Sequence, residues 1–209
     1  MRRMPWLRTA AASLVVCVVG GALLWRGTDG FRALTSEQAR RVSIARNPRA
    51  VPVVALEDQN GTAFTLAAYG GQPLALEFIY TQCVSVCAML SEEFRRIDRA
   101  ERLNGTAGRE RLNLVSISFD PRDTPIRLRE YAARYGADGR HWRFARVRDT
   151  RELAKLLRAF DIVVIPDGRG DYQHNAAIHL LDTAGRLTRV LDINADPGEV
   201  TRTAASTGR

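Results

Sequence analysis

The sequence predicts an α/β domain built on a central mixed sheet and preceded by one apolar N-terminal helix. An uncharged apolar run occupies residues 9–25. From residue 51 onwards, short runs of strand character alternate with charged segments of helical periodicity. Turn signals separate paired strand runs at both ends of this region. A chain of 209 residues with 45% apolar residues is long enough for one well-packed domain and an appendage.

The apolar run predicts a membrane-spanning helix. Its length lies at the lower edge of what crosses about 30 Å of hydrocarbon. Arg2, Arg3 and Arg8 precede it, so the positive-inside rule places the N-terminus in the cytoplasm and the rest of the chain outside. A cleaved signal peptide is the alternative, but no obvious small-x-small cleavage site ends the run. We therefore expect an uncleaved anchor over residues 1–27.

Residues 28–50 are polar and arginine-rich, which predicts a juxtamembrane tether with one short helix over 36–45. The globular domain is expected to cover residues 51–209. A short basic N-terminus that runs straight into the anchor favours a bacterial periplasm over a mitochondrial intermembrane space. We therefore expect a single-pass inner-membrane protein whose C-terminal domain lies in the periplasm.

The formal charge of +8 does not indicate nucleic-acid binding. The positive residues are spread over the whole chain, nearly all are arginine, and no basic stripe alternates with aromatic residues. A distributed composition bias explains the charge, and attraction to an anionic membrane surface is a secondary alternative.

The domain begins with two short strand runs around Asn60-Gly61, a strong hairpin signal. A nearly continuous apolar run then suits a strand covered on both faces, although Glu77 within it needs a buried partner or a role. The expected strands are 53–56, 63–66, 74–80, 112–119, 142–147, 176–182 and 187–193. The order of strands and helices, with a hairpin at the front and another at the back, is thioredoxin-like.

The expected helices have recognisable ends. Asp123-Thr124-Pro125 opens one helix with a cap residue and a proline at the first helical position, and Gly136 ends it. Residues 149–152 resemble a capping box for the next helix. A helix with apolar residues at positions 90, 94, 97 and 103 follows the cysteine pair, and a last helix covers about 197–205.

Cys83 and Cys87 lie at a strand-to-helix junction with three residues between them. One helical turn of separation places both sulfurs on the same side, with Cβ atoms about 5 to 6 Å apart, so that both can reach one ion. The free N–H groups and positive dipole of a helix N-terminus favour the thiolate, which binds metals and attacks disulfides. A structural disulfide is the alternative, with little stabilisation because the loop is short. Cys17 is expected to be an ordinary membrane residue.

Histidine occurs only at positions 141, 174 and 179. His174 is expected in a loop just before the strand at 176–182, and in a thioredoxin-like sheet that loop faces the N-terminus of the cysteine helix. Two thiolates with one imidazole form a soft, low-coordinate ligand set that suits copper, whereas a structural zinc site usually needs a fourth ligand. His141 and His179 are expected to be surface or packing residues.

Two segments resemble the Sco/SenC family of copper proteins: residues 78–83 (FIYTQC) followed by Cys87, and residues 116–125 (SISFDPRDTP). The similarity covers about residues 52–196, together with the anchor. In that family two cysteines and a histidine before a late strand bind one copper ion, Cu(I) or Cu(II). The resemblance therefore implies a copper site of Cys83, Cys87 and His174. The segment 120–125 itself is interpreted as a strand end, a turn and a capped helix, without a role in the site.

The chain departs from the family pattern beside these residues. Val84 and Ala88 stand where family members often have proline, and Gln173 stands where aspartate often precedes the histidine. No ligand is removed. A missing carboxylate weakens control of the imidazole and shifts metal affinity or redox preference.

The resemblance implies a metallochaperone that assists copper-centre assembly in cytochrome c oxidase. The expected partners are the oxidase subunit that holds the copper centre, a copper donor chaperone or thiol reductant, and the membrane. The alternative is a membrane-anchored thiol-disulfide oxidoreductase in which Cys83 and Cys87 form a redox-active disulfide. Thiol-disulfide oxidoreductases typically have two residues between their cysteines, whereas Cys83 and Cys87 have three. A thioredoxin-fold peroxidase with Cys83 as the peroxidatic thiol has no further support in the motif.

Overall fold

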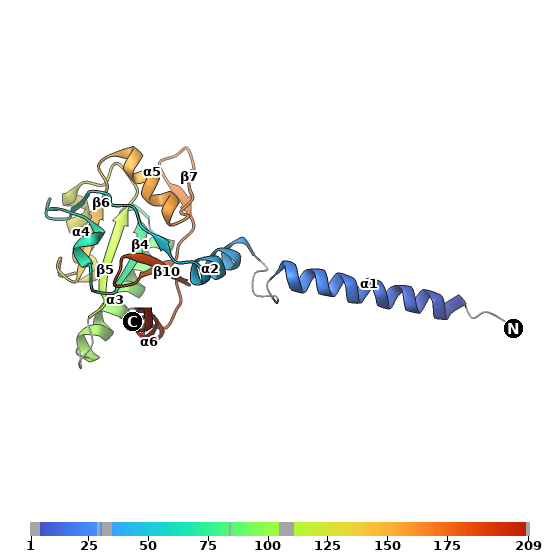
Figure 1. Ribbon diagram of the computed structural model, residues 1–209. Helices are drawn as coiled ribbons and strands as arrows, with labels where there is room; N and C mark the ends of the chain where they lie inside the picture. Colours follow the sequence, from blue (N-terminus) through green and yellow to red (C-terminus); the bar gives the residue numbers. More distant parts are fainter. Residues whose placement is uncertain (1–4, 29, 31–34, 84, 105–110, 208–209) are drawn as a thin grey trace. The chain divides into compact units, whose positions relative to one another are not determined.

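The computed structural model describes residues 5–28, 30, 35–83, 85–104 and 111–207 (Figure 1). The chain divides into two compact units, Met1–Arg46 and Asn47–Arg209. The expectations about Arg2, Arg3 and Val84 lie outside the described residues, as do positions 29 and 31–34 of the expected tether. The domain boundaries after residues 27 and 50 stay predictions.

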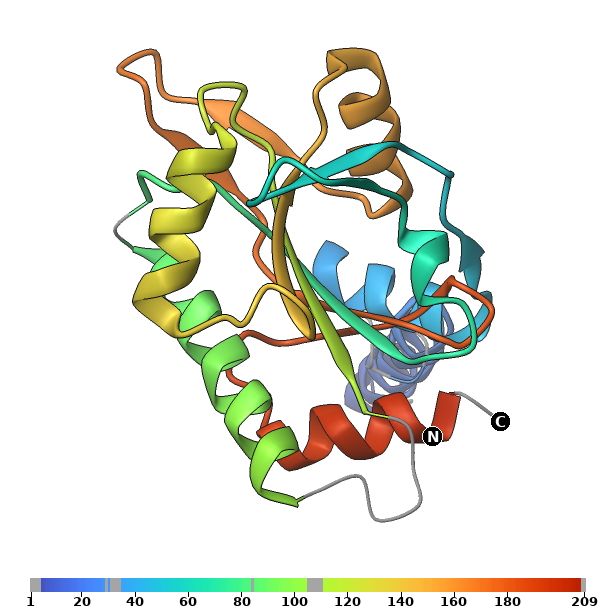
Figure 2. The same cartoon turned by 90° about the vertical axis from the view of Figure 1, so that its left-hand side faces the viewer.

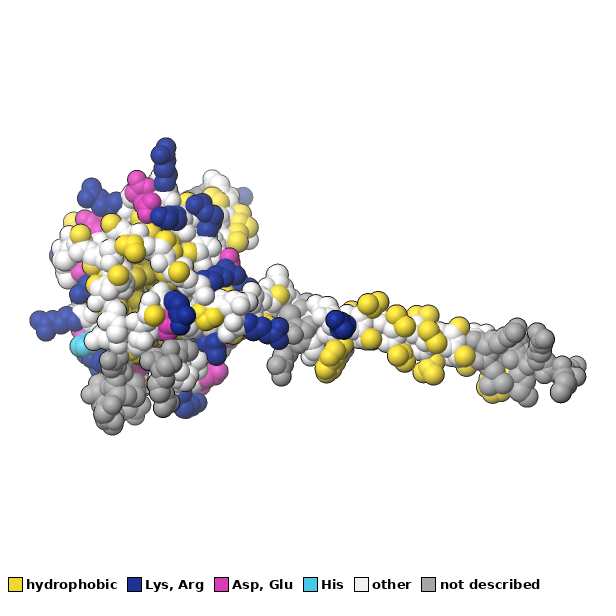
Figure 3. Space-filling model, viewed as in Figure 1, with side chains coloured by type: hydrophobic (Ala, Val, Ile, Leu, Met, Phe, Trp, Pro, Cys, Tyr) yellow, Lys and Arg dark blue, Asp and Glu magenta, His cyan; other side chains and the backbone are white. Residues whose placement is uncertain are grey.

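The first unit contains two helices, α1 (Pro5–Gly27) and α2 (Ser36–Arg46). Within α1, Thr9–Gly27 is long and apolar enough to cross a membrane. Apolar side chains cover this helix along its described length (Figure 3). A signal sequence meets the same criteria, so the helix is a span or a signal. The helix expected at 36–45 is confirmed and ends one residue later.

The second unit is built on an eight-stranded sheet with the order β1-β10-β9-β4-β5-β6-β2-β3. Strands β4, β5 and β6 are parallel, and all other neighbours are antiparallel, so the expected mixed sheet is confirmed. The strands are β1 (Arg49–Ala50), β2 (Leu56–Asp58), β3 (Ala63–Phe64), β4 (Leu74–Ile79), β5 (Asn113–Ser118), β6 (Trp142–Arg146), β9 (Ile178–Leu181) and β10 (Arg186–Leu191).

Helices cover both faces of this sheet. They are α3 (Val86–Asn104), α4 (Pro125–Tyr135), α5 (Thr150–Ala159) and α6 (Pro197–Thr207). Glu77 on β4 contacts Ser91 on α3, whereas the neighbouring Phe78 packs against Phe160 beside α5. Successive strand residues point to opposite faces, so α3 and α5 cover opposite faces. The α6 helix packs against α3 (Figure 2).

The predicted helix ends at α4 and α5 are confirmed. The Thr124 side chain accepts the backbone N–H of Arg127, and Gly136 ends α4 in the left-handed conformation at φ 72°. A glycine is favoured there because it has no Cβ to clash. Asp149 accepts the N–H groups of Arg151 and Glu152 at the start of α5.

The N-terminal hairpin is confirmed, but its strands differ from the expected 53–56 and 63–66. The observed strands are β2 and β3, with a short 3-10 helix at Leu66–Tyr69. The Asp58 carboxylate accepts the backbone N–H groups of Asn60 and Thr62. Because this local bonding forms the turn directly after Asp58, the strand β2 continues as far as Asp58.

A second, two-stranded sheet was not predicted. It pairs β7 (Val164–Pro166) with β8 (Tyr172–His174), and we call it the β7–β8 ribbon. The expectation that His174 lies in a loop is therefore wrong, because it ends β8. The sequence did carry a signal, an apolar run at 162–165 followed by Asp167-Gly168-Arg169-Gly170. Both glycines adopt positive φ angles, which the turn requires.

Candidate metal centre

The dithiol lies where β4 ends and α3 begins. Cys87 is the second residue of α3, and its backbone N–H points at the Cys83 sulfur, 3.4 Å away. The Cys83 sulfur thereby accepts one of the N–H groups that a helix N-terminus leaves without a partner. Ser85 Oγ lies 3.7 Å from the same sulfur. Both cysteines are buried and neither forms a disulfide.

The two thiols differ sharply in acidity. The Cys87 side chain, as a hydrogen-bond partner of the Cys83 sulfur, lowers the pKa of Cys83 to about 5, and the backbone N–H groups of Cys87 and Ser85 add to this against the effect of burial. The pKa of Cys87 is raised, first by its hydrogen bond to Cys83 and then by burial. At neutral pH the pair therefore consists of a thiolate at Cys83 and a thiol at Cys87.

His174 reaches this pair from the β7–β8 ribbon. Its Nε2 atom lies 3.3 Å from the Cys87 sulfur, so the predicted approach of His174 to the dithiol is confirmed for Cys87. The imidazole packs against the rings of Phe119 and Tyr80, with centroid separations of 4.9 and 6.3 Å. Burial lowers its pKa, so the ring is neutral at pH 7, which is the form that binds a metal.

The three side chains present suitable donor atoms for a soft metal ion. Among the described residues, however, no three His, Cys, Asp or Glu side chains already form a cage around an ion position. The thiols interact with each other and with His174, as expected for ligands that share hydrogen bonds before a metal displaces the protons. The assignment of Cys83, Cys87 and His174 as ligands stays a prediction.

The surroundings of the second ring nitrogen of His174 show whether a carboxylate holds the imidazole, which matters because Gln173 stands where family members often have aspartate. Nδ1 is buried, and no hydrogen bond of normal geometry reaches it from the described residues. Gln173 is exposed. Among the described residues, no carboxylate therefore holds the ring through this nitrogen, and packing against Phe119 and Tyr80 contributes to its orientation.

The other candidate residues lie elsewhere. His179 is fully buried between Phe78 and Phe160, with ring separations of 5.7 and 5.3 Å. His141 lies beside Asp138, with Nδ1 3.1 Å from the carboxylate. Both histidines are therefore packing or surface residues, as expected. Cys17 belongs to α1 in the first unit.

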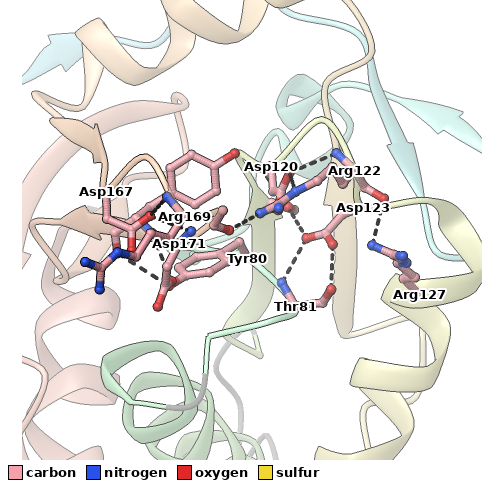
Figure 4. Close-up of polar contacts among 12 residues, drawn as sticks. Tyr80, Thr81, Asp120, Arg122, Asp123, Arg127, Asp167, Arg169 and Asp171 are labelled. Atoms are coloured by element: carbon pink, nitrogen blue, oxygen red, sulfur yellow. Dashed lines mark hydrogen bonds and ion pairs between the residues drawn. The ribbon is translucent and has the colours of Figure 1, made fainter.

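The segment 120–125 is bonded to the loop that precedes Cys83, through Asp123 and Thr81 (Figure 4). The fully buried Asp123 accepts hydrogen bonds from the Thr81 backbone N–H, the Thr81 hydroxyl and Ser118. It thereby ties the loop that leads to Cys83 to the start of α4. Its interpretation as a turn and a capped helix holds, and the structure adds this tie to the cysteine loop.

Glu77 has partners on both neighbouring elements. Its carboxyl accepts the hydroxyl of Ser116 on β5 and that of Ser91 on α3, 3.3 Å away, and Ser116 in turn accepts the Trp142 indole N–H. Burial raises the pKa of Glu77 to about 8, against the opposing effect of the two serines. Glu77 is therefore protonated at neutral pH, which explains how a carboxyl is accommodated in a fully buried strand.

Comparison with known proteins identifies the family to which the chain is related. The SCO1/SenC family model matches residues 46–207. A Stutzerimonas stutzeri protein whose name refers to copper binding is 30% identical over 189 residues, 88% of either chain. The structure of Bradyrhizobium japonicum ScoI with copper bound matches 76% of this chain and 99% of its own, with 29% identity and a TM-score of 0.63.

An Aquifex aeolicus VF5 structure whose name refers to electron transfer shares 26% identity over 77% of this chain and 93% of its own, with a TM-score of 0.69. The predicted thioredoxin-like α/β class is thus confirmed, and the family match spans nearly all of the second unit. The family model covers well over half of the chain, and the chain belongs to the SCO1/SenC family.

Proposed function

We propose that this protein binds one copper ion through Cys83, Cys87 and His174 and passes it to the copper centre of cytochrome c oxidase. The observation that carries the proposal is the 3.3 Å approach of His174 Nε2 to the Cys87 sulfur, beside the Cys83 sulfur that accepts the Cys87 backbone N–H. A set of two sulfurs and one imidazole suits copper and leaves coordination positions open for transfer to a recipient. The Sco family is one of cytochrome c oxidase assembly proteins, which supports the recipient proposed.

Metal binding would use the acid–base asymmetry of the dithiol. Cys83 supplies a thiolate that is already formed, and His174 supplies a neutral ring nitrogen. Cys87 is the one ligand that must lose a proton. Uptake and release of copper are therefore coupled to the protonation of a single thiol.

Copper titration of the full chain tests the proposal. We expect one copper per chain, with sulfur-to-copper charge-transfer bands for Cu(II), and loss of stoichiometric binding in each of Cys83→Ser, Cys87→Ser and His174→Ala. The matched controls are Cys17→Ser and His141→Ala, which change the same residue types away from the site. Full copper retention in any of the three site variants would contradict the three-ligand site.

A thiol-disulfide oxidoreductase is the second candidate, because a low-pKa thiolate beside a protonated thiol is also suited to dithiol exchange. In that reaction the Cys83 thiolate attacks a disulfide of the substrate, and Cys87 resolves the mixed disulfide, leaving a Cys83–Cys87 disulfide and a reduced substrate. A disulfide-reduction assay separates the two functions. Full activity of His174→Ala without copper would favour the oxidoreductase.

We further propose that α1 anchors the chain in the inner membrane and that residues 51–209 work in the periplasm, with residues 28–50 as a tether. The apolar Thr9–Gly27 stretch supports this arrangement. Membrane fractionation followed by intact-mass measurement is the test. A full-length mass in the membrane fraction supports an anchor, whereas a shortened chain in the soluble periplasm indicates a cleaved signal.

A further inference from the structure

The β7–β8 ribbon is separate from the eight-stranded sheet, and yet it carries His174. A two-stranded ribbon is marginally stable by itself, so its position depends on contacts with the body of the domain. At the His174 end, Asn175 bonds the Val163 N–H and the Asp161 carbonyl. The question is therefore what holds the other end of the ribbon beside the dithiol.

Arg122 makes that connection (Figure 4). Its guanidinium donates to the Gly170 carbonyl, 2.6 Å away, in the turn between β7 and β8. The same group lies 5.5 Å from the centre of the Tyr172 ring on β8. Arg122 thus contacts both the turn of the ribbon and the strand that ends at His174.

The other side of Arg122 is fixed to the body of the domain. Its Nε and Nη2 atoms pair with the Asp120 carboxylate, with a shortest separation of 2.7 Å, and its backbone N–H donates to the same carboxylate. Asp120 is buried and its own N–H donates to Ser118. Because a bidentate guanidinium–carboxylate pair fixes direction as well as distance, Arg122 is a rigid support.

Aromatic packing and one further bond complete the attachment. The Tyr172 ring packs on Phe119 and Tyr80 at 5.5 and 5.2 Å, and these two rings also contact His174. The Tyr80 hydroxyl donates to the Asp171 carboxylate. A shift of Tyr172 would therefore move the surfaces that orient the imidazole.

We infer that Arg122 is a positioning residue for copper binding, which holds the β7–β8 ribbon so that His174 Nε2 faces the dithiol. The inference rests on the proposed copper function. It gives a role to a residue of the 116–125 segment that the sequence assigned only to a turn. Gln173 supplies no carboxylate to the imidazole. Arg122 instead positions the imidazole indirectly, by holding the ribbon that carries it.

The test compares Arg122→Gln with Arg169→Gln in the full chain. Arg169 is exposed in the turn of the same ribbon, so its replacement removes the same charge without removing the contacts to Asp120, Gly170 and Tyr172. We expect Arg122→Gln to weaken Cu(II) binding about tenfold. We also expect reduced nitrogen hyperfine coupling from His174, and Arg169→Gln to match the wild type in both measurements.

A metal-free measurement tests the same inference independently. Amide hydrogen exchange of the peptide spanning Val164–His174 should lose protection in apo Arg122→Gln and keep it in apo Arg169→Gln. If Arg122→Gln does not fold because Asp120 is left buried without its cation, Arg122→Lys carries the test. Lysine keeps the charge but cannot span Asp120 and Gly170 with one compact ammonium group.

The outcomes separate the two proposals. Wild-type copper affinity together with wild-type exchange in the Arg122 variant would overturn the positioning role and leave the copper site standing. Equal changes in the Arg122 and Arg169 variants would also overturn it, since charge alone would then explain them. A wild-type chain that binds no copper would contradict the proposed function. The comparison of amide hydrogen exchange in the apo variants would still decide whether Arg122 holds the ribbon.

Discussion

The Cys87 sulfur and His174 Nε2 lie 3.3 Å apart, although 87 positions separate them in the chain. Cys87 comes from the first turn of α3, and His174 comes from the end of a ribbon outside the main sheet. The site is therefore formed by two elements whose relative position is set by the fold. Its protonation pattern leads directly to the first prediction.

Copper binding at pH 7 should release about one proton per ion. The pKa of Cys83 is lowered to about 5, so its sulfur is already a thiolate. Burial lowers the pKa of His174, so its ring is already neutral and releases no proton on binding, whereas the raised pKa of Cys87 keeps that thiol protonated. Calorimetric titration in buffers of different ionisation enthalpy measures the number. Release of two protons would show that Cys83 is not a thiolate before binding.

Alkylation of the metal-free, reduced chain should occur at Cys83 before Cys87. The thiolate is the nucleophile, and the lowered pKa of Cys83 means that its rate levels off above about pH 5. Peptide mass mapping after brief iodoacetamide treatment distinguishes the two sulfurs. In Cys87→Ala the pKa of Cys83 should rise, because its largest stabilising contact is lost, while Cys87→Ser should retain part of the effect. Faster modification of Cys87 in the wild type would contradict the assignment.

The Glu77→Gln variant should remove a pH dependence of stability. Burial raises the folded-state pKa of Glu77, so between its ordinary value of 4.5 and about 8 the folded state binds a proton that the unfolded state has lost. Stability from this group is fully present below pH 4.5 and falls as pH rises to 8, by up to about 1.4 kcal/mol per pH unit.

Urea unfolding at pH 5 and pH 8 measures this difference. Glutamine keeps the size and hydrogen-bonding ability of the protonated side chain and does not ionise, so the fall in stability should become smaller. Glu92→Gln is the control, since Glu92 lies on an exposed part of α3 and pairs with Arg95. An unchanged dependence in Glu77→Gln would show that another group causes it.

Replacement of Asp123 by alanine should destabilise the domain by about 3 kcal/mol. The change leaves the Thr81 N–H, the Thr81 hydroxyl and the Ser118 hydroxyl without their buried acceptor. Asp123→Asn should reduce the stability less than alanine does, because its carbonyl oxygen can still accept a hydrogen bond. It should still cost some stability, since its amide nitrogen cannot accept from the remaining donors. Equilibrium unfolding measures both variants. Equal stability of Asp123→Ala and the wild type would show that Asp123 does not tie the cysteine loop to α4.

The sequence by itself determined the elements whose signals are local. The α4 ends follow from Thr124, Pro125 and Gly136, because a cap, a preset φ and a left-handed glycine act within a few residues. The strand at 74–80 follows from its apolar run. The spacing of Cys83 and Cys87 likewise predicts their closeness, and in the structure Cys83 precedes α3 and its sulfur accepts the backbone N–H of Cys87.

Only the tertiary structure decided what surrounds these residues. The low pKa of Cys83 depends on how the Cys87 side chain and backbone N–H meet its sulfur, and the neutral state of His174 depends on burial between the ribbon and the domain. The β7–β8 ribbon escaped prediction because its strands are three residues each, too short for a clear alternation.

The sequence thus specified the two cysteines and the family, and the fold decided where His174 lies and what holds it there. Arg122 illustrates the reason. In the sequence it belongs to a turn, and its contacts with Gly170 and Tyr172 span about fifty positions that no local pattern connects. Packing between distant segments, and with it the geometry of the centre, exists only once the chain has folded.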